Sequence, residues 1–416
     1  MVRRSSDKTW NIEHECPQCG APVLLEESDR IFSCAYCRVR LYLTSRDHFR
    51  YYLPPSNPPS RETLYIPYWR FRGVSFFCGA RRITSKVSDL TVLASRHGFF
   101  PRSVGLRPQV LTLRFVTSEL EGKFFKPRTL PAGLTDIIEN QAMEMGDLLP
   151  SGPIFHIGET ISLIYSPVYI QGSQFYDGIL GRPMASIPIH FVDELLTFQQ
   201  EDWNIRFVPT LCPRCGWDLL GERDSVVLLC HHCESAWHAT RDGLQQVDFG
   251  LLPGPNGHAQ YLPFWKMKVS LAGLPLHSYA DLLRIANAPK VIKEEWEGED
   301  LCFWSPAFKL PPGAFLRLAK GLTLSPPMDT LEEKLPPSPP CPMTLPLSEA
   351  VEGIKVTLAT TAVDKKELLP KLPGLRVHVK DPLLVFMPFV LQGNEFIHPP
   401  TRCCVHKNYL RIGRNL

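Results

Sequence analysis

Residues 16–20 read Cys-Pro-Gln-Cys-Gly, and a second Cys-x-x-Cys pair stands at residues 34–37, with fourteen residues between the inner cysteines. The same pattern, Cys-x2-Cys-x14-Cys-x2-Cys, returns at residues 212–233. Each Cys-x-x-Cys turn aims two thiolates at one point, and a short hairpin places the second turn opposite the first, so that four sulfurs complete a tetrahedron. Two quartets with equal spacing predict two structural Zn²⁺ ions per chain, with these ligands: Cys16, Cys19, Cys34, Cys37, Cys212, Cys215, Cys230 and Cys233.

The first pair of each quartet is Cys-Pro-x-Cys-Gly, in which proline presets φ and glycine accepts the positive φ of a tight turn. Over about 25 residues per copy this sequence resembles the knuckle of zinc-ribbon and rubredoxin-like modules. The resemblance leaves a rubredoxin-like electron-transfer centre, with iron held by four thiolates, as the alternative. The second pairs, Cys34-Ala-Tyr-Cys37 and Cys230-His-His-Cys233, lack the proline and glycine of the second rubredoxin knuckle, which favours zinc.

The remaining five cysteines are odd in number and irregularly spaced, as expected of free thiols in a reducing compartment: Cys78, Cys302, Cys341, Cys403 and Cys404. The longest clean apolar run, residues 383–391, contains a proline and is too short to span a bilayer. The first residues are polar and lead into no apolar segment. We therefore predict a cytoplasmic protein with no membrane insertion.

A longer repeat surrounds the cysteines. Tyr65-Ile-Pro-Tyr-Trp69 follows Cys37 by 28 residues, and Tyr261-Leu-Pro-Phe-Trp265 follows Cys233 by the same 28, so the copies are offset by 196. Further on, a Pro-x-x-x-Gln-Gly segment at residues 167–172 returns at residues 388–393, with an offset of 221. We expect this closing segment to pair with the Tyr-x-Pro-x-Trp strand of its own half. The pattern predicts an internal duplication of class α+β, in which each half is a four-cysteine zinc ribbon followed by a strand-rich α+β domain.

The predicted domains are a zinc ribbon at 11–50, an α+β domain at 60–200, a second ribbon at 205–246 and a second α+β domain at 257–416. Residues 325–347, with eight prolines, predict an exposed extended insertion that accounts for the growing offset. Helices are predicted at residues 135–149, 191–200, 278–286 and 346–358. The chain also resembles uncharacterised bacterial proteins in which a Cys-Pro-x-Cys-Gly ribbon precedes a Tyr-x-Pro-x-Trp segment, a likeness that implies architecture and no function.

The Tyr-x-Pro-x-Trp strand alternates large aromatic residues with cations, which predicts a half-buried strand. Its aromatic face predicts core, and its proline predicts an edge strand or a strand start. The sharper alternative is a platform that stacks nucleic-acid bases, with the cations contacting phosphates. The segment from Arg61 to Arg128 has thirteen Lys or Arg against four acidic residues, which fits an anionic partner. The candidate contacts are Arg70, Arg72, Arg81, Arg82, Lys266 and Lys268.

No catalytic motif stands in the sequence, and both quartets consist of thiolates alone, as in structural zinc sites. The formal net charge of +3 is too small to dictate a partner. The sequence favours a non-catalytic zinc-binding adaptor or structural subunit of a larger protein assembly, with a protein partner. The alternative is a nucleic-acid-binding zinc-ribbon protein that uses the basic segment 61–128, and the third hypothesis is the scaffold of an enzyme or electron carrier.

Overall fold

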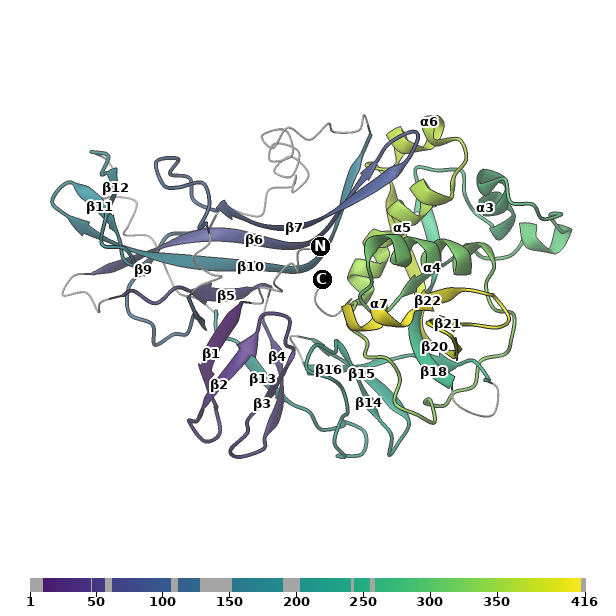
Figure 1. Ribbon diagram of the computed structural model, residues 1–416, viewed down its shortest axis with the longest axis horizontal. Coiled ribbons are helices and arrows are strands. Elements are labelled where there is room, and N and C mark those ends of the chain that lie inside the picture. The colour runs from purple at the N-terminus through teal and green to yellow at the C-terminus, as the bar shows by residue number, and fades with distance from the viewer. Residues whose placement is uncertain are drawn as a thin grey trace.

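The structure, a computed structural model, describes residues 10–45, 47–56, 62–105, 111–127, 152–189, 203–240, 243–254 and 259–412. In these residues the chain is rich in strands, and its α-helices all lie beyond residue 278 (Figure 1). This composition fits the predicted α+β class. The helices predicted at residues 135–149 and 191–200 lie outside the described residues.

Two long antiparallel strands form the centre of the first half, β6 (Thr63–Cys78) and β10 (Ile154–Gln171). The shorter strands that join them are β5 (Phe49–Tyr52), β7 (Ile83–Leu93), β8 (Leu113–Phe115), β9 (Lys123–Phe124), β11 (Gln174–Asp177) and β12 (Pro183–Ser186). β7 pairs with β6, β5 runs parallel to β10, and β11 continues β10 as a hairpin. Trp69 of β6 lies opposite Leu163 of β10.

The second half is built around an equivalent pair, β18 (Ala259–Ala272) and β20 (Arg376–Gln392). Its shorter strands are β17 (Phe249–Leu251), β19 (Cys302–Pro306), β21 (Glu395–Ile397) and β22 (Cys404–His406). β19 pairs with β18, β17 runs parallel to β20, and β21 continues β20 as a hairpin. Trp265 lies opposite Leu384, as Trp69 lies opposite Leu163. The predicted pairing of each closing segment with the Tyr-x-Pro-x-Trp strand is therefore confirmed in both halves.

Both Tyr-x-Pro-x-Trp strands have neighbouring strands on both sides, so the prediction of an edge strand or a strand start is wrong for each strand as a whole. Each proline is the fifth residue of its strand, and among the described strands Pro67 itself pairs only with β10 and Pro263 only with β20. Proline has no N–H to donate, and one neighbouring ladder stops beside it. β7 ends opposite Tyr68 and β19 ends opposite Phe264, one residue after each proline. β6 is buried on both faces over its first nine residues, which corrects the prediction of a half-buried strand.

The helices cover the sheet of the second half. They are α3 (Tyr279–Ala286), α4 (Pro312–Leu324), α5 (Leu347–Thr361), α6 (Lys365–Leu368) and α7 (Lys407–Ile412), with 3-10 turns η2 (Glu294–Glu297) and η3 (Leu369–Lys371). α3 and α5 confirm the helices predicted at residues 278–286 and 346–358. α4 is not among the predicted helices, because its proline and its two glycines weaken the helical pattern.

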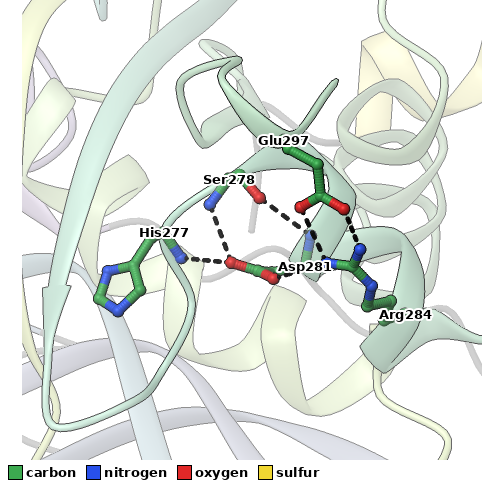
Figure 2. A network of polar contacts seen from close by, with 5 residues as sticks. All are labelled: His277, Ser278, Asp281, Arg284 and Glu297. Atoms are coloured by element: carbon green, nitrogen blue, oxygen red, sulfur yellow. Dashed lines mark hydrogen bonds and ion pairs between the residues drawn. The ribbon is translucent and has the colours of Figure 1, made fainter. Parts of the chain in front are cut away.

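α3 begins with a capping box, shown in Figure 2. The Ser278 hydroxyl accepts the backbone N–H of Asp281 at 3.2 Å, and the Asp281 carboxylate accepts the N–H groups of His277 and Ser278 at 3.0 and 3.2 Å. Arg284 in the last turn binds both Asp281 and Glu297 of η2. These bonds satisfy N–H groups that a helix start leaves without partners, and they anchor η2 to the helix.

The proline-rich segment 325–347 is extended but packs on the second half, so the prediction that it is exposed is wrong in part. Leu335, Met343 and Leu345 are buried in the main apolar core. The indole N–H of Trp265 donates to the backbone carbonyl of Leu345 at 3.0 Å. The segment therefore covers the aromatic face of β18.

The two halves share a core where the ends of β6 and β10 meet the helices of the second half (Figure 1). Phe76 and Ile157 pack in the same apolar cluster as Phe315 of α4. Gly353 of α5 lies against this contact, and a Cβ there would come within 3.2 Å of the Phe315 ring and 3.6 Å of Ile157. The predicted four-domain division stays a prediction, but these contacts show that its α+β parts pack together.

Candidate metal centres

The eight cysteines of the two quartets form two compact clusters, as predicted. In each cluster the four sulfurs lie within 4.8 Å of one another. The closest Sγ–Sγ separations are 3.6 Å for Cys16–Cys37 and Cys19–Cys34, and 3.6 and 3.5 Å for Cys212–Cys233 and Cys215–Cys230. A tetrahedral zinc site with four thiolates and Zn–S bonds of about 2.3 Å has sulfurs about 3.8 Å apart. The clusters therefore fit a four-coordinate metal ion, and all thirteen cysteines are free thiols.

Each knuckle is closed by a backbone turn that needs a positive φ. The N–H of Gly20 donates to the carbonyl of Cys16 at 2.8 Å, and Gly216 makes the same bond to Cys212 at 2.8 Å. Gly20 and Gly216 have φ of 73° and 74°. In the second knuckles Arg38 and Glu234 stand at this position, with φ of 61° and 47°. The second knuckles therefore keep the positive φ of the turn although they have Arg38 and Glu234 in place of glycine.

Backbone N–H groups lower the pKa of one thiol in each cluster. In the first, hydrogen bonding by the backbone of Cys37 outweighs burial and lowers the pKa of Cys34 to about 7. In the second, burial opposes ionisation of Cys212, but hydrogen bonds from the backbone of Cys215 and Arg214 lower its pKa to about 6. Metal ions bind thiolates, so each cluster offers one readily ionised ligand near neutral pH, and metal binding releases the remaining protons.

The first ribbon (residues 10–45) is joined to the sheet of the first half. Its strands are β1 (Asn11–Glu15), β2 (Pro22–Glu26), β3 (Ile31–Ser33) and β4 (Arg40–Thr44). β1 pairs with β2 and also runs parallel to β8 of the large sheet. The ligands Cys16 and Cys34 belong to the same apolar cluster as Tyr51 and Ile66. The metal site therefore stands directly on the core of the first half.

Arg70 is buried, which corrects its assignment as a contact for an anionic partner. Its side chain has 0% exposure and forms an ion pair with Glu27, which follows β2 of the first ribbon. Arg70 also donates to the Asp89 carboxylate at 3.1 and 3.2 Å, and its guanidinium lies 3.4 Å from the centre of a Trp10 ring. Ser162 of β10 donates to Glu27 at 3.2 Å. This cluster holds the first ribbon against β6 and β10.

The aromatic face of β6 is core, as predicted. Tyr65, Trp69 and Phe71 are buried together with Leu163 and Tyr165 of β10. These rings are covered on the folded protein, which rules out the alternative that they stack nucleic-acid bases.

The other predicted anion contacts lie on separate elements. Arg81 and Arg82 are exposed in the turn between β6 and β7, and Arg72 is half-buried in β6. In β18, Lys266 lies over the Trp304 ring at 5.8 Å, and Lys268 forms an ion pair with Asp300 at 3.1 Å. The structure does not assign a ligand to any of them.

The second ribbon (residues 206–247) packs against the first, side by side with it in Figure 1. Its strands are β13 (Arg206–Pro209), β14 (Val227–Cys230), β15 (Ser235–Thr240) and β16 (Gly243–Val247). β13 pairs with β4 of the first ribbon. The N–H groups of Arg30 and Ile31 donate to the carbonyl of Arg223 at 2.7 and 2.9 Å, and Arg223 forms an ion pair with Asp29. The two metal clusters therefore belong to one joined unit.

Sequence reasoning missed the apolar side chains that the ribbons expose. Leu24 and Leu220 are 57% and 48% exposed, and Tyr36 and Trp217 are 73% and 60% exposed. The Trp217 ring stacks on His232 with centroids 4.9 Å apart and an interplanar angle of 15°. The offset of 196 relates Leu24 to Leu220 and Tyr36 to His232, so the repeat alone could have singled out these positions as a matching pair of surfaces on the two ribbons.

Comparison with protein-family models, with curated proteins and with solved structures finds no match. Within the described residues, none of the helices is both long enough and apolar enough to cross a bilayer.

Proposed function

We propose that the chain is a tandem duplication whose two ribbons each hold a structural Zn²⁺ ion, and that it acts as a non-catalytic adaptor or subunit of a larger protein assembly. The observation that carries this proposal is the pair of closed four-cysteine clusters, set in two ribbons that pack together and expose apolar side chains. Four thiolates fill the coordination sphere of zinc and leave no position for water, as in structural sites. The free state of every cysteine supports a reducing compartment, which we propose is the cytoplasm.

The duplication is supported by the equal pairing order of the two halves. β5, β10, β6 and β7 lie in the same order and directions as β17, β20, β18 and β19. The register is also shared, because Tyr65 lies opposite Pro167 and Tyr261 opposite Pro388. Corresponding turns follow β10 and β20, where Gly172 and Gly393 have φ of 60° and 62°. Independent origin of both halves would not require these agreements.

A protein partner is supported by the surface of the ribbons. Exposed Tyr36 and Trp217 supply large apolar area, and aromatic residues are enriched where proteins bind each other. Residues 10–45 contain five carboxylates and three arginines, and residues 206–240 contain four and three. Each zinc ion with its four thiolates adds a net charge of −2, because the thiolates outweigh one Zn²⁺. The ribbons are therefore acidic, which disfavours nucleic acid and fits a partner with apolar residues next to basic ones.

The test is purification of the full chain under native conditions, with metal analysis of whatever co-elutes. Two zinc ions per chain and a stoichiometric protein that survives nuclease treatment are expected. The double variant Tyr36→Ala/Trp217→Ala should lose this protein, whereas Val291→Ala, at an exposed residue of the second half, should retain it. Co-eluting nucleic acid that salt removes, and that Arg81→Ala/Arg82→Ala loses, would establish the nucleic-acid alternative instead. Bound iron with visible absorption would point to an electron carrier.

A further inference from the structure

The two cysteine clusters differ in the polar side chains around them. In the second ribbon the hydroxyl of Ser235 lies 3.1 Å from Sγ of Cys233 and 3.7 Å from Sγ of Cys212. The indole N–H of Trp237 donates to the same hydroxyl at 2.8 Å. Ser235 and Trp237 are two residues apart on β15 and are both buried, so their side chains share one face of the strand.

The direction of these hydrogen bonds follows from the donors. An indole N–H can only donate, so the Ser235 oxygen is the acceptor of the Trp237 bond. The hydroxyl proton of Ser235 is then directed toward the sulfurs, and a metal-bound thiolate can only accept it. Trp237, Ser235 and Cys233 therefore form a relay that ends on a metal ligand. Because Ser235 is fully buried, water does not compete for this bond.

The first ribbon has no equivalent relay. At the offset of 196, Ser235 corresponds to Val39 and Trp237 to Leu41, and neither side chain can donate a hydrogen bond. Among the residues that the structure describes, the side-chain hydrogen-bond contacts of the first cluster's sulfurs are with one another. Cys19 is also exposed, whereas its counterpart Cys215 is half-buried. The sulfurs of the first cluster thus receive fewer hydrogen bonds from side chains and are more open to solvent.

We propose that Ser235, oriented by Trp237, stabilises the thiolates of the second cluster, so that the two metal sites are unequal: the second retains its ion while the first exchanges it. A hydrogen bond to a thiolate spreads its negative charge and makes the sulfur a poorer target for protons and oxidants. Residues that orient metal ligands from outside typically change metal affinity by about 10- to 100-fold when they are replaced. The first cluster becomes the site at which chelators or oxidants act first.

This inference rests on the proposed occupancy of both clusters by Zn²⁺, and the experiment tests the two separately. The full chain is first analysed for zinc, and metal release to an excess of a chromogenic chelator is then followed. Two zinc ions and two release phases that differ in rate by at least about tenfold are expected. Alkylation of thiols during the fast phase, read by peptide mass spectrometry, should label Cys16, Cys19, Cys34 and Cys37. A chain that binds no zinc would overturn the proposed metal sites, whereas two ions released in one phase would overturn only their inequality.

Variants then identify the cause of the slow phase. Ser235→Ala should accelerate it by about tenfold or more, and Trp237→Phe, which removes only the N–H, should accelerate it less. Ser235→Thr keeps the hydroxyl and should restore slow release, which separates the hydrogen bond from a packing effect. Val39→Ser places a hydroxyl at the corresponding position of the first ribbon and serves as the matched control for the fast phase. A slow phase that Ser235→Ala leaves unchanged, in a variant with native far-UV circular dichroism, would refute the role of Ser235.

Discussion

The buried pair of Glu27 and Arg70 gives the sharpest test of how the first ribbon is attached. Replacing Glu27 by Gln keeps the shape of the side chain and removes its charge. Arg70 then stays in the core with Asp89 and the Trp10 ring, but it loses the negative charge of Glu27, which is buried beside it, whereas Asp89 is partly exposed. Because Arg70 has no contact with water, the missing charge is not replaced by solvent.

The size of the effect follows from this geometry. Removing one member of a buried ion pair typically costs about 3–5 kcal/mol, since the other charge stays desolvated. Asp89 is partly exposed and still binds the guanidinium, which places Glu27→Gln at the lower end, at about 3 kcal/mol. Glu13→Gln is a matched control, because Glu13 also joins the first ribbon to an arginine of the sheet, Arg114, but in an exposed pair 2.7 Å apart. It should cost no more than about 1 kcal/mol.

Urea denaturation of the zinc-loaded chain, followed by tryptophan fluorescence, measures both variants. A third variant, Glu27→Gln/Arg70→Met, removes both charges and should be less destabilised than Glu27→Gln alone. A cost of less than about 1 kcal/mol for Glu27→Gln, or a double variant that is destabilised as much as Glu27→Gln or more, would contradict this prediction.

His398 is 1% exposed, and its burial lowers its pKa to about 4. Unfolding therefore takes up a proton between pH 6.5 and 4, and the free energy of unfolding, which is at its full value above pH 6.5, falls by up to about 3 kcal/mol toward pH 4. His398→Gln should flatten this pH dependence in urea titrations. Gly216→Ala places a Cβ at a φ of 74°, which costs about 1 kcal/mol and should weaken zinc binding about fivefold in a competition assay. Chelation of the bound metal should loosen the sheet of the first half as well as the first ribbon, because Cys16 belongs to their shared core. An unchanged near-UV circular dichroism spectrum after chelation would contradict this expectation.

What the sequence predicts correctly depends on local spacing or on repetition. The cysteine spacing is set by two turns and one hairpin, so the clusters around Cys16 and Cys212 follow from short-range geometry. The pairing of β6 with β10 and of β18 with β20 is predictable because both strands recur in both halves. The Ser278 helix start is predictable because a capping residue acts within one turn.

What the sequence does not predict depends on contacts between distant segments. A period of two places Arg70 and Trp69 on opposite faces of a strand, but it does not say that another element covers the second face. The cover comes from Glu27 and Trp10 of the ribbon, far from Arg70 in the chain. Likewise, the proline-rich segment reads as exposed because proline favours extended chain, while its scattered apolar residues such as Met343 show no period from which their burial could be deduced.

The contact between the ribbons shows how the proposed duplication is assembled. β4 of the first ribbon pairs with β13, whereas its repeat counterpart β15 pairs with β14 and β16 and, among the described strands, forms no ladder with the first ribbon. The ion pair of Arg223 with Asp29 is equally one-sided, because the repeat positions are Glu27 and Ser225, and Glu27 binds Arg70 instead. A twofold axis would repeat each contact with the roles exchanged. The ribbons therefore join head to tail, because the edge of β4 that pairs with β13 corresponds in the second ribbon to an edge of β15 that pairs with β16.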